Sequence, residues 1–180
     1  MKTILVPVDF SAATTPVMTA AAALAKPLRA RVVLVHCVRP PSLGAGLSPD
    51  AEKLIETAEH SALGQLAGCV QAMKDLGLEA EAVSLYGPPV PMIEAEIERL
   101  APDHIVMGSH GHTALPSLLV GSTARGVLRT SPCPVTIVPA SREAVQRASG
   151  ASASSEGVRS GGRPTAGSGV VRFAGGMRMP

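Results

Sequence analysis

The feature that most constrains the fold is a repeated alternation between short apolar runs and longer segments with helical spacing. Four runs contain no Asp, Glu, Lys or Arg and are rich in Val, Ile and Leu: 4–8, 32–38, 104–107 and 135–138. Apolar runs of this length indicate strands that are buried on both faces, which is typical of a parallel sheet covered by helices. Residues 79–86 alternate polar and apolar side chains instead, and predict a fifth strand with a more exposed face at an edge of the sheet.

Helices are predicted in each gap between these strands. The expected helical ranges are 12–28, 48–76, 88–100 and 122–129. Ser11 is the expected N-cap of the first helix, and Pro27 should end that helix or fray its last turn because proline lacks a backbone N–H. The glutamates of the third helix, Glu96 among them, are interpreted as solvated side chains. The alternation predicts an α/β fold: a doubly wound, open, five-stranded parallel sheet with helices on both faces.

Charge is unevenly distributed along the chain. Residues 1–140 hold ten Lys and Arg against twelve Asp and Glu, a balance of −2, whereas residues 141–180 hold six Arg against two Glu, a balance of +4. The second part consists largely of Ser, Gly, Ala and Arg, and it has too few large apolar residues to offset the entropy of ordering it. We therefore predict one folded domain, 1–140, and a disordered tail, 141–180. The mildly acidic domain does not favour a nucleic-acid surface.

The cysteines and the N-terminal residues bear on the location of the protein. Cys37, Cys69 and Cys133 are scattered and form no Cys-x-x-Cys pair, which favours a reducing compartment over a zinc site or a disulfide framework. The apolar run 4–8 is too short for a signal peptide and ends at Asp9. No segment reaches the roughly 18 apolar residues of a membrane helix. We expect a cytoplasmic protein that does not bind a membrane.

The segment 108–123 is the strongest candidate for a binding site. It leaves the carboxyl end of a predicted strand and reaches the start of a predicted helix, at the edge where open α/β sheets bind ligands. Gly108, Gly111 and Gly121 would let a ligand approach the backbone, and a helix start offers N–H groups to a phosphate. On spacing alone, a plain connection with Ser122 as the N-cap explains the segment equally well. The chain has neither a Gly-x-x-x-x-Gly-Lys-[Ser/Thr] loop nor a Gly-x-Gly-x-x-Gly motif after its first strand.

The glycine spacing of this segment matches a family motif. Gly108-x-x-Gly111, nine further residues and Gly121-Ser122 reproduce the pattern Gly-2x-Gly-9x-Gly-[Ser/Thr]. In this pattern the chain resembles the universal stress protein family, in its ATP-binding, UspA-like branch. Residues 4–11, 33–38 and 133–138 resemble the first, second and last strands of that family, so the similarity covers about residues 1–139. The resemblance implies the strand order 3-2-1-4-5 and the fold of the adenine-nucleotide alpha-hydrolase-like proteins.

The resemblance also implies a nucleotide site. Its residues would be Pro7, Val8, Asp9, Cys37, Gly108, Ser109, His110, Gly111, His112, Gly121, Ser122 and Thr123. Asp9 would bond the adenine, as would the main chain at Cys37. Residues 109–112 would border the ribose and the phosphates, and residues 121–123 would hold the phosphates. A divalent cation, Mg or Mn, would accompany the nucleotide. Val8 departs from the family, in which Thr is frequent at this position, and therefore lacks one hydroxyl.

Each of these residues also has an ordinary structural interpretation. Asp9 could be a helix-capping acid. His110 and His112 could be exposed loop histidines. His36 is interpreted as structural, and no catalytic or metal-ligating residue is assigned.

Three functions compete. The leading hypothesis is a stress-response regulator whose conformation or oligomeric state depends on bound ATP, with AMP and cyclic AMP as alternatives. The family commonly dimerises through its last strand, so the apolar edge of Val135, Ile137 and Val138 predicts a homodimer. The second hypothesis is a weak ATPase or an adenylate-transferring enzyme, against which no paired carboxylates flank the glycine segment. The third is a nucleotide-free protein-interaction module of the same fold, a role expected of family members that lack the glycine motif.

Overall fold

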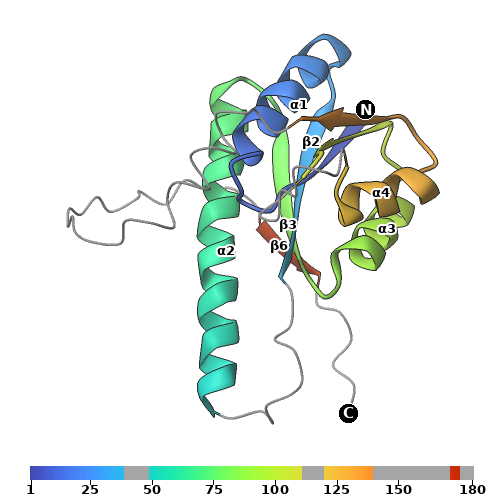
Figure 1. Cartoon of the computed structure of the whole chain (residues 1–180). Coiled ribbons are helices and arrows are strands. Elements are labelled where there is room, and N and C mark those ends of the chain that lie inside the picture. Colours follow the sequence, from blue (N-terminus) through green and yellow to red (C-terminus); the bar gives the residue numbers. More distant parts are fainter. Residues whose placement is uncertain (39–48, 111–119, 140–170, 175–180) are drawn as a thin grey trace.

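The structure, a computed structural model, describes residues 1–38, 49–110, 120–139 and 171–174, and of residues 49–56 and 171–174 the backbone only. Its strands are β1 (Thr3–Pro7), β2 (Arg31–Val38), β3 (Ala80–Tyr86), β4 (His104–Gly108), β5 (Val135–Val138) and β6 (Val171–Ala174). They form one parallel sheet in the order β5-β4-β1-β2-β3-β6 (Figure 1). The predicted five-stranded order 3-2-1-4-5 is therefore confirmed for β1 to β5.

β6 is an addition to the predicted sheet. It pairs in parallel with β3, with Leu85 opposite Ala174. The structure describes residues 171–174 of the predicted disordered tail as a strand, and the rest of the segment 141–180 lies outside the described residues. The physical reason is that β3 would otherwise end the sheet with a row of unpaired backbone N–H and C=O groups, and a short β-prone run of the same chain supplies their partners.

Two layers of helices enclose the sheet. They are α1 (Thr14–Leu28), α2 (Pro49–Asp75), α3 (Pro89–Leu100) and α4 (Ser122–Thr130). α1 and α2 cover one face, where Ile4 and Leu34 are buried. α3 and α4 cover the other face, where Leu5 and Ile105 are buried (Figure 1). Successive side chains of a strand point to opposite faces, so a strand that lies between two helix layers is apolar at most of its positions.

The ends of α1 agree with the prediction at one end and differ at the other. Ala13, not Ser11, is the N-cap, and Ser11 Oγ accepts the backbone N–H of Ala13 at 3.3 Å instead. The expected cap is therefore wrong, because the chain makes a separate turn before the helix begins. Pro27 lies in the last turn of α1, which closes at Arg29 with a left-handed φ of 49°. This end is confirmed, since a proline there removes one helical hydrogen bond.

Glu96 and the strand β3 are more buried than predicted. Glu96 is 3% exposed, and Arg99 donates hydrogen bonds to both of its carboxylate oxygens. Nε donates to Oε2 at 2.9 Å, and Nη2 donates to Oε1. A buried carboxylate is tolerated when its charge and its lone pairs are matched in this way. β3 is also enclosed: Ala82 packs in the core under α2, and Val83 packs in the core under α3. The expected exposed face of this strand is therefore absent.

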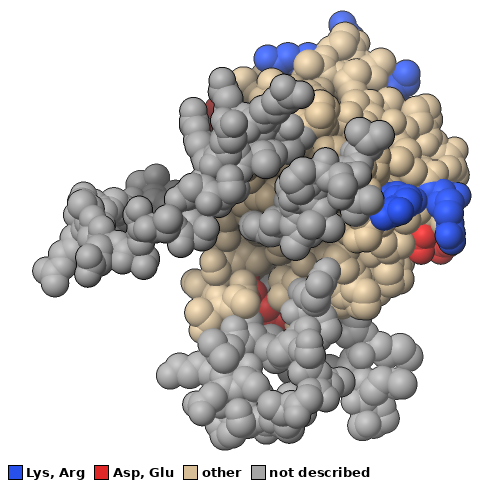
Figure 2. All heavy atoms as spheres, viewed as in Figure 1, with Lys and Arg blue, Asp and Glu red and all other residues tan. Residues whose placement is uncertain are grey.

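The outer surface carries few charges on the face drawn in Figure 2. Most of the described surface there is uncharged, and Lys and Arg form small separate groups. One group lies beside acidic side chains on the side of α3 and α4. Among the described helices, none combines the length and the apolar composition that a membrane span needs.

Candidate functional site

A pocket of about 440 Å³, here named the switch-point pocket, lies at the carboxyl ends of β1, β2 and β4. β1 has β2 on one side and β4 on the other, so the strand order reverses at this point. Open α/β sheets bind ligands in the crevice at such a reversal. The first turns of α1, α3 and α4 complete the wall. The volume suits a nucleotide-sized molecule, because small-molecule pockets span about 300–1,000 Å³.

The switch-point pocket contains every predicted site residue that the structure describes. These residues are Pro7, Val8, Asp9, Cys37, Gly108, Ser109, His110, Gly121, Ser122 and Thr123. Gly111 and His112 lie outside the described residues. Residues that follow three different strands thus share one pocket, as the predicted topology requires. Their roles in binding remain predictions.

The turn after β1 holds Asp9 in a strained segment. Phe10 has a φ of 59°, a left-handed value that is unfavourable for a residue with a bulky side chain. Asp9 Oδ1 accepts the N–H of Ser11 at 3.1 Å, a turn hydrogen bond that precedes α1, and the residue also lines the pocket. Asp9 does not cap α1, whose N-cap is Ala13. The ring of Phe10 lies 4.3 Å from that of His36, and His36 Nδ1 lies 2.8 Å from the carbonyl oxygen of Val8. Because a carbonyl only accepts, Nδ1 carries the proton.

Gly108 and Gly121 lie where a Cβ would make tight contacts with the loop that follows β4. A Cβ on Gly108 would be 3.2 Å from the carbonyl oxygen of His110 and 3.3 Å from the Cβ of Ala13. A Cβ on Gly121 would be 3.2 Å from the carbonyl oxygen of Ser109. Neither glycine has a positive φ, so close approach is what requires them. Together they bring the loop and two helix starts around the pocket.

α4 begins at the wall of the switch-point pocket. Its N-cap is Gly121, so the alternative in which Ser122 caps the helix is wrong. No side chain caps α4, and its first turn contains no acidic residue. The N–H groups and the positive end of a helix dipole favour an anionic group in this position. Ser122 and Thr123 also line the pocket and add two hydroxyls beside the helix start.

Two buried polar atoms of the pocket have no hydrogen-bond partner among the described residues. Within the described chain, the buried side-chain nitrogens and oxygens that lack a hydrogen bond are Thr14 Oγ1 and His110 Nε2, and both residues line the switch-point pocket. The other ring nitrogen of His110 lies 3.2 Å from Ser109 Oγ. Buried polar groups are almost always hydrogen-bonded in folded proteins, so these atoms indicate a polar ligand. These two atoms, the tight glycine contacts and the helix start without a side-chain cap are all features that suit a bound nucleotide.

Cys37 contributes to the pocket without reactive chemistry. Burial raises the pKa of its thiol to about 12, and Sγ lies 4.0 Å from the carbonyl oxygen of Pro89. The thiolate is the form that acts as nucleophile and as metal ligand, so this thiol does neither near neutral pH. Its apolar surface and its main chain are what Cys37 offers a ligand.

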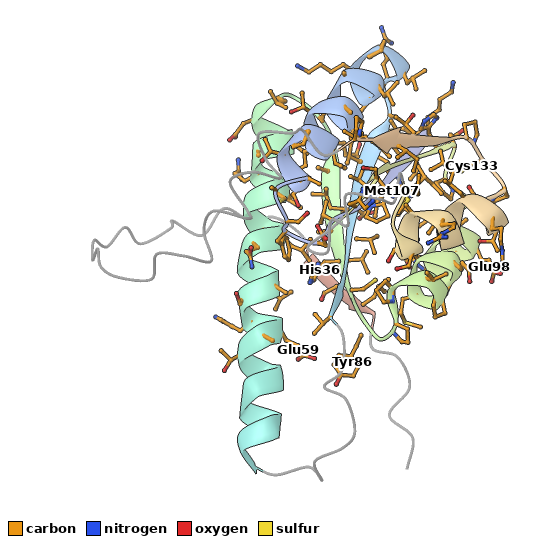
Figure 3. The ribbon with its side chains drawn as sticks, viewed as in Figure 1. His36, Glu59, Tyr86, Glu98, Met107 and Cys133 are labelled. Carbon is orange, nitrogen blue, oxygen red and sulfur yellow. The ribbon has the colours of Figure 1, made fainter. Side chains whose placement is uncertain are left out.

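Some residues of the pocket wall are not predicted from the sequence. The further lining residues include Thr14, His36, Pro89, Ile93 and Met107. In Figure 3, His36 and Met107 lie in the interior between the helix layers, whereas Glu98 lies toward the outside. His36 precedes Cys37 at the end of a buried strand, and that position is a signal that could have found it. Thr14 has no comparable signal, since threonine is ordinary in the first turn of a helix.

A second cavity, of about 520 Å³, lies between α1 and α2. Its lining contains no acidic or basic side chain, and it shares Thr14 with the switch-point pocket. No group of three or more His, Cys, Asp or Glu among the described residues could hold a metal ion. The switch-point pocket is therefore the candidate site, and a cation there would depend on oxygens of the ligand.

Comparison with known proteins points to one family. The model of the universal stress protein family matches residues 1–139. A universal stress protein of Thermus aquaticus is 34% identical over 142 residues, which cover 76% of this chain and 98% of the relative.

Solved structures of the same family share the fold. The universal stress protein UspA from Lactobacillus plantarum is 26% identical with a TM-score of 0.70, and the match covers 76% of this chain and 97% of that one. A universal stress protein from Archaeoglobus fulgidus in complex with dAMP is 27% identical with a TM-score of 0.54, and covers 76% and 97%. From its sequence, its sheet order and these relatives, the chain belongs to the universal stress protein family.

Proposed function

We propose that the chain binds an adenine nucleotide, ATP foremost, in the switch-point pocket and acts as a nucleotide-dependent regulator of the stress response. The observation that carries this proposal is the pocket itself. A helix start without a side-chain cap, two glycines with little room for a Cβ, and two buried polar atoms that have no partner among the described residues meet where the strand order reverses. The relative from Archaeoglobus fulgidus, whose structure holds dAMP, supports an adenine nucleotide as the ligand.

Each end of the pocket has a proposed task. Asp9 and the main chain of Cys37 bind the adenine at the ends of β1 and β2. Ser109 and His110 border the ribose and the phosphates. The start of α4, residues 121–123, holds the phosphates, because backbone N–H groups and hydroxyls there line the pocket. A magnesium or manganese ion accompanies the nucleotide and is bound largely through phosphate oxygens.

The proposed assembly is a homodimer formed through β5. This strand ends the sheet beside β4, and each of its residues is partly exposed. Val135, Ile137 and Val138 would leave apolar side chains and an unpaired backbone edge in solvent, which a second copy would cover. We place the protein in the cytoplasm, because Cys37, Cys69 and Cys133 are free thiols.

Calorimetric titration with ATP, AMP, cyclic AMP and GTP, with and without magnesium, tests the proposal. We expect saturable binding of adenine nucleotides. A Gly121→Val variant should weaken that binding by at least about 100-fold, or about 2.7 kcal/mol, because its side chain would press on Ser109 and occupy the phosphate end of the pocket.

The matched control is Gly64→Val on α2. A Cβ at Gly64 meets nothing within 4 Å, so this variant adds the same side chain at a distant exposed position. It should bind nucleotide as the wild type does. A folded wild-type protein that binds none of the four nucleotides would show that the glycine segment is only a turn, and would favour the protein-interaction module instead.

A further inference from the structure

One unpartnered atom of the switch-point pocket belongs to a residue with no assigned task. The proposed binding residues include His110 but not Thr14, whose Oγ1 is buried without a partner among the described residues. Thr14 is the first residue of α1 and lines the pocket. Because α1 and α4 cover opposite faces of the sheet, Thr14 reaches the pocket from the side facing the proposed phosphate-binding helix.

Thr14 lies at the glycine-framed end of the pocket. The Cβ position of Gly108 is 3.3 Å from the Cβ of Ala13, the residue before Thr14. The Cβ position of Gly121 is 3.8 Å from His110 Cδ2, the ring carbon bonded to the unpartnered Nε2. Of the two residues with unpartnered atoms, His110 thus belongs to the loop that follows β4 and lies beside Gly121, whereas Thr14 follows Ala13, which lies beside Gly108.

The start of α1 favours an anion at this end. Its N-cap, Ala13, makes no side-chain cap hydrogen bond, and its first turn contains no acidic residue. The backbone N–H of Thr14 already donates to the carbonyl oxygen of Ser11 at 3.0 Å, so its hydroxyl is the donor that it can offer a ligand. A phosphate oxygen accepts such a bond and gains from the helix dipole, whereas an uncharged group gains little from the dipole.

We propose that Thr14 is a nucleotide-binding residue whose hydroxyl donates a hydrogen bond to a phosphate group held between the starts of α1 and α4. The inference rests on the proposed function and adds to it a determinant of specificity: Thr14 distinguishes phosphorylated adenine nucleotides from adenosine. A buried hydroxyl without a protein partner lowers stability, and a phosphate oxygen removes that penalty. Thr14 thus trades stability of the free protein for affinity.

The test compares AMP with adenosine in four proteins. Thr14→Val removes the hydroxyl and keeps the shape of the side chain, and Thr14→Ser keeps the hydroxyl. Thr15→Val is the matched control, because Thr15 is the exposed neighbour on the same helical turn and does not line the switch-point pocket. Calorimetry measures the dissociation constants, and thermal unfolding of the free protein is followed for each variant.

Thr14→Val should weaken the binding of AMP by about tenfold to a hundredfold, the range expected for a lost hydrogen bond to a charged group. It should change the dissociation constant of adenosine by less than about twofold. Its melting temperature without ligand should equal or exceed that of the wild type. Thr14→Ser and Thr15→Val should retain wild-type affinity for AMP.

An equal loss of affinity for AMP and for adenosine in Thr14→Val would overturn the inference and assign the residue a structural role. A lowered melting temperature of the ligand-free variant would do the same. Unchanged AMP binding by Thr14→Val, with a wild type that binds AMP, removes this inference alone. A wild type that binds neither ligand removes the proposed function and the inference with it.

Discussion

The amino ends and the carboxyl ends of the strands both carry polar side chains, but the two sets differ in their hydrogen bonding. At the amino ends, Arg31 donates to Thr3 Oγ1 at 3.0 Å and to Glu81 Oε1 at 3.1 Å. Asp103 Oδ2 accepts the N–H of Thr3 at 2.8 Å, so strand starts and the loop before β4 are linked. At the carboxyl ends, two buried polar atoms have no partner within the described residues, and a residue after β1 has a strained φ.

The difference separates a stabilising end from a binding end. Hydrogen-bonded polar groups at the amino ends contribute to the stability of the fold, because their partners are fixed by the chain itself. Unpartnered groups and backbone strain are unfavourable in the free protein, and they concentrate where a ligand is bound. Substitutions at the amino ends should therefore change stability and leave nucleotide affinity unchanged, and the reverse should hold at the carboxyl ends.

The largest effect on stability is expected at Arg99. Arg99→Met removes the donors of buried Glu96, whose carboxylate is then left without them, and should lower the free energy of unfolding by about 1–3 kcal/mol. The hydrogen bond to Glu96, and then the negative charges of Glu96 and Glu81, raise the pKa of Arg99. Glu81 also pairs with Arg31, so Arg99 interacts electrostatically with the polar groups at the amino ends of the strands. Urea unfolding measures the loss, and calorimetry should show unchanged nucleotide affinity.

The control for this prediction is Glu98→Met on the exposed face of α3, which should change stability by less than about 0.5 kcal/mol. A double variant, Glu96→Leu with Arg99→Met, should recover much of the lost stability, because no buried charge is left unpaired. Weaker nucleotide binding by Arg99→Met would contradict the separation of the two ends.

The sequence predicts the strands and the pocket better than it predicts single side chains. The runs that became β1, β2 and β4 contain no Asp, Glu, Lys or Arg because helices cover both faces, and this pattern indicates buried strands. Loops after such strands meet by topology, which is why Asp9 and Gly108 could be placed in one pocket. The burial of Glu96 depends on the geometry of Arg99, and the task of Thr14 depends on a hydrogen bond that is not made. Neither leaves a signal in residue spacing.

The sixth strand shows a second limit of the sequence. Residues 171–174 form a short β-prone run, but they lie within a segment rich in Ser, Gly and Arg whose overall composition predicts no strand. What favours it is the unpaired outer edge of β3, a feature of the assembled sheet and not of the tail. Pairing between segments so distant in sequence follows from tertiary structure and cannot be derived from periodicity.

A smaller effect is expected from removal of the tail. A chain that ends at Pro139 should still fold and should bind nucleotide within about twofold of the full chain. It should lose less than about 2 kcal/mol of stability, since the hydrogen bonds of one short edge strand are partly offset by the entropy of closing a long loop. It should also self-associate more at high concentration, because the edge of β3 is unpaired.

Light scattering and calorimetry measure both results, and a chain that lacks only residues 175–180 is the control because it keeps β6. Leu85 pairs with Ala174 on one side and with Cys37 on the other, so β6 lies two strands from the pocket wall. A strong loss of nucleotide affinity on tail removal would show that the binding end depends on β6 as well as on the loops that line it.

The smallest effect concerns a buried group at the binding end, the neutral thiol of Cys37. Desolvation raises its pKa from 9.0 to about 12 in the folded chain. The unfolded chain therefore releases this proton first, and the stability that the buried thiol provides is complete below about pH 9 and is lost as the pH rises toward about 12. Between pH 8 and pH 9.5 the loss should stay under about 1 kcal/mol, because one group changes stability by at most about 1.4 kcal/mol per pH unit.

Urea unfolding of wild type and Cys37→Ser over that pH range measures the contribution. Burial also raises the pKa of Cys69, which both proteins retain, so the difference between them isolates Cys37. The serine variant can still donate toward the carbonyl oxygen of Pro89, and it should show the shallower decline. Identical slopes would mean that Cys37 is solvated in the folded protein, and that the adenine end of the pocket is more open than its lining indicates.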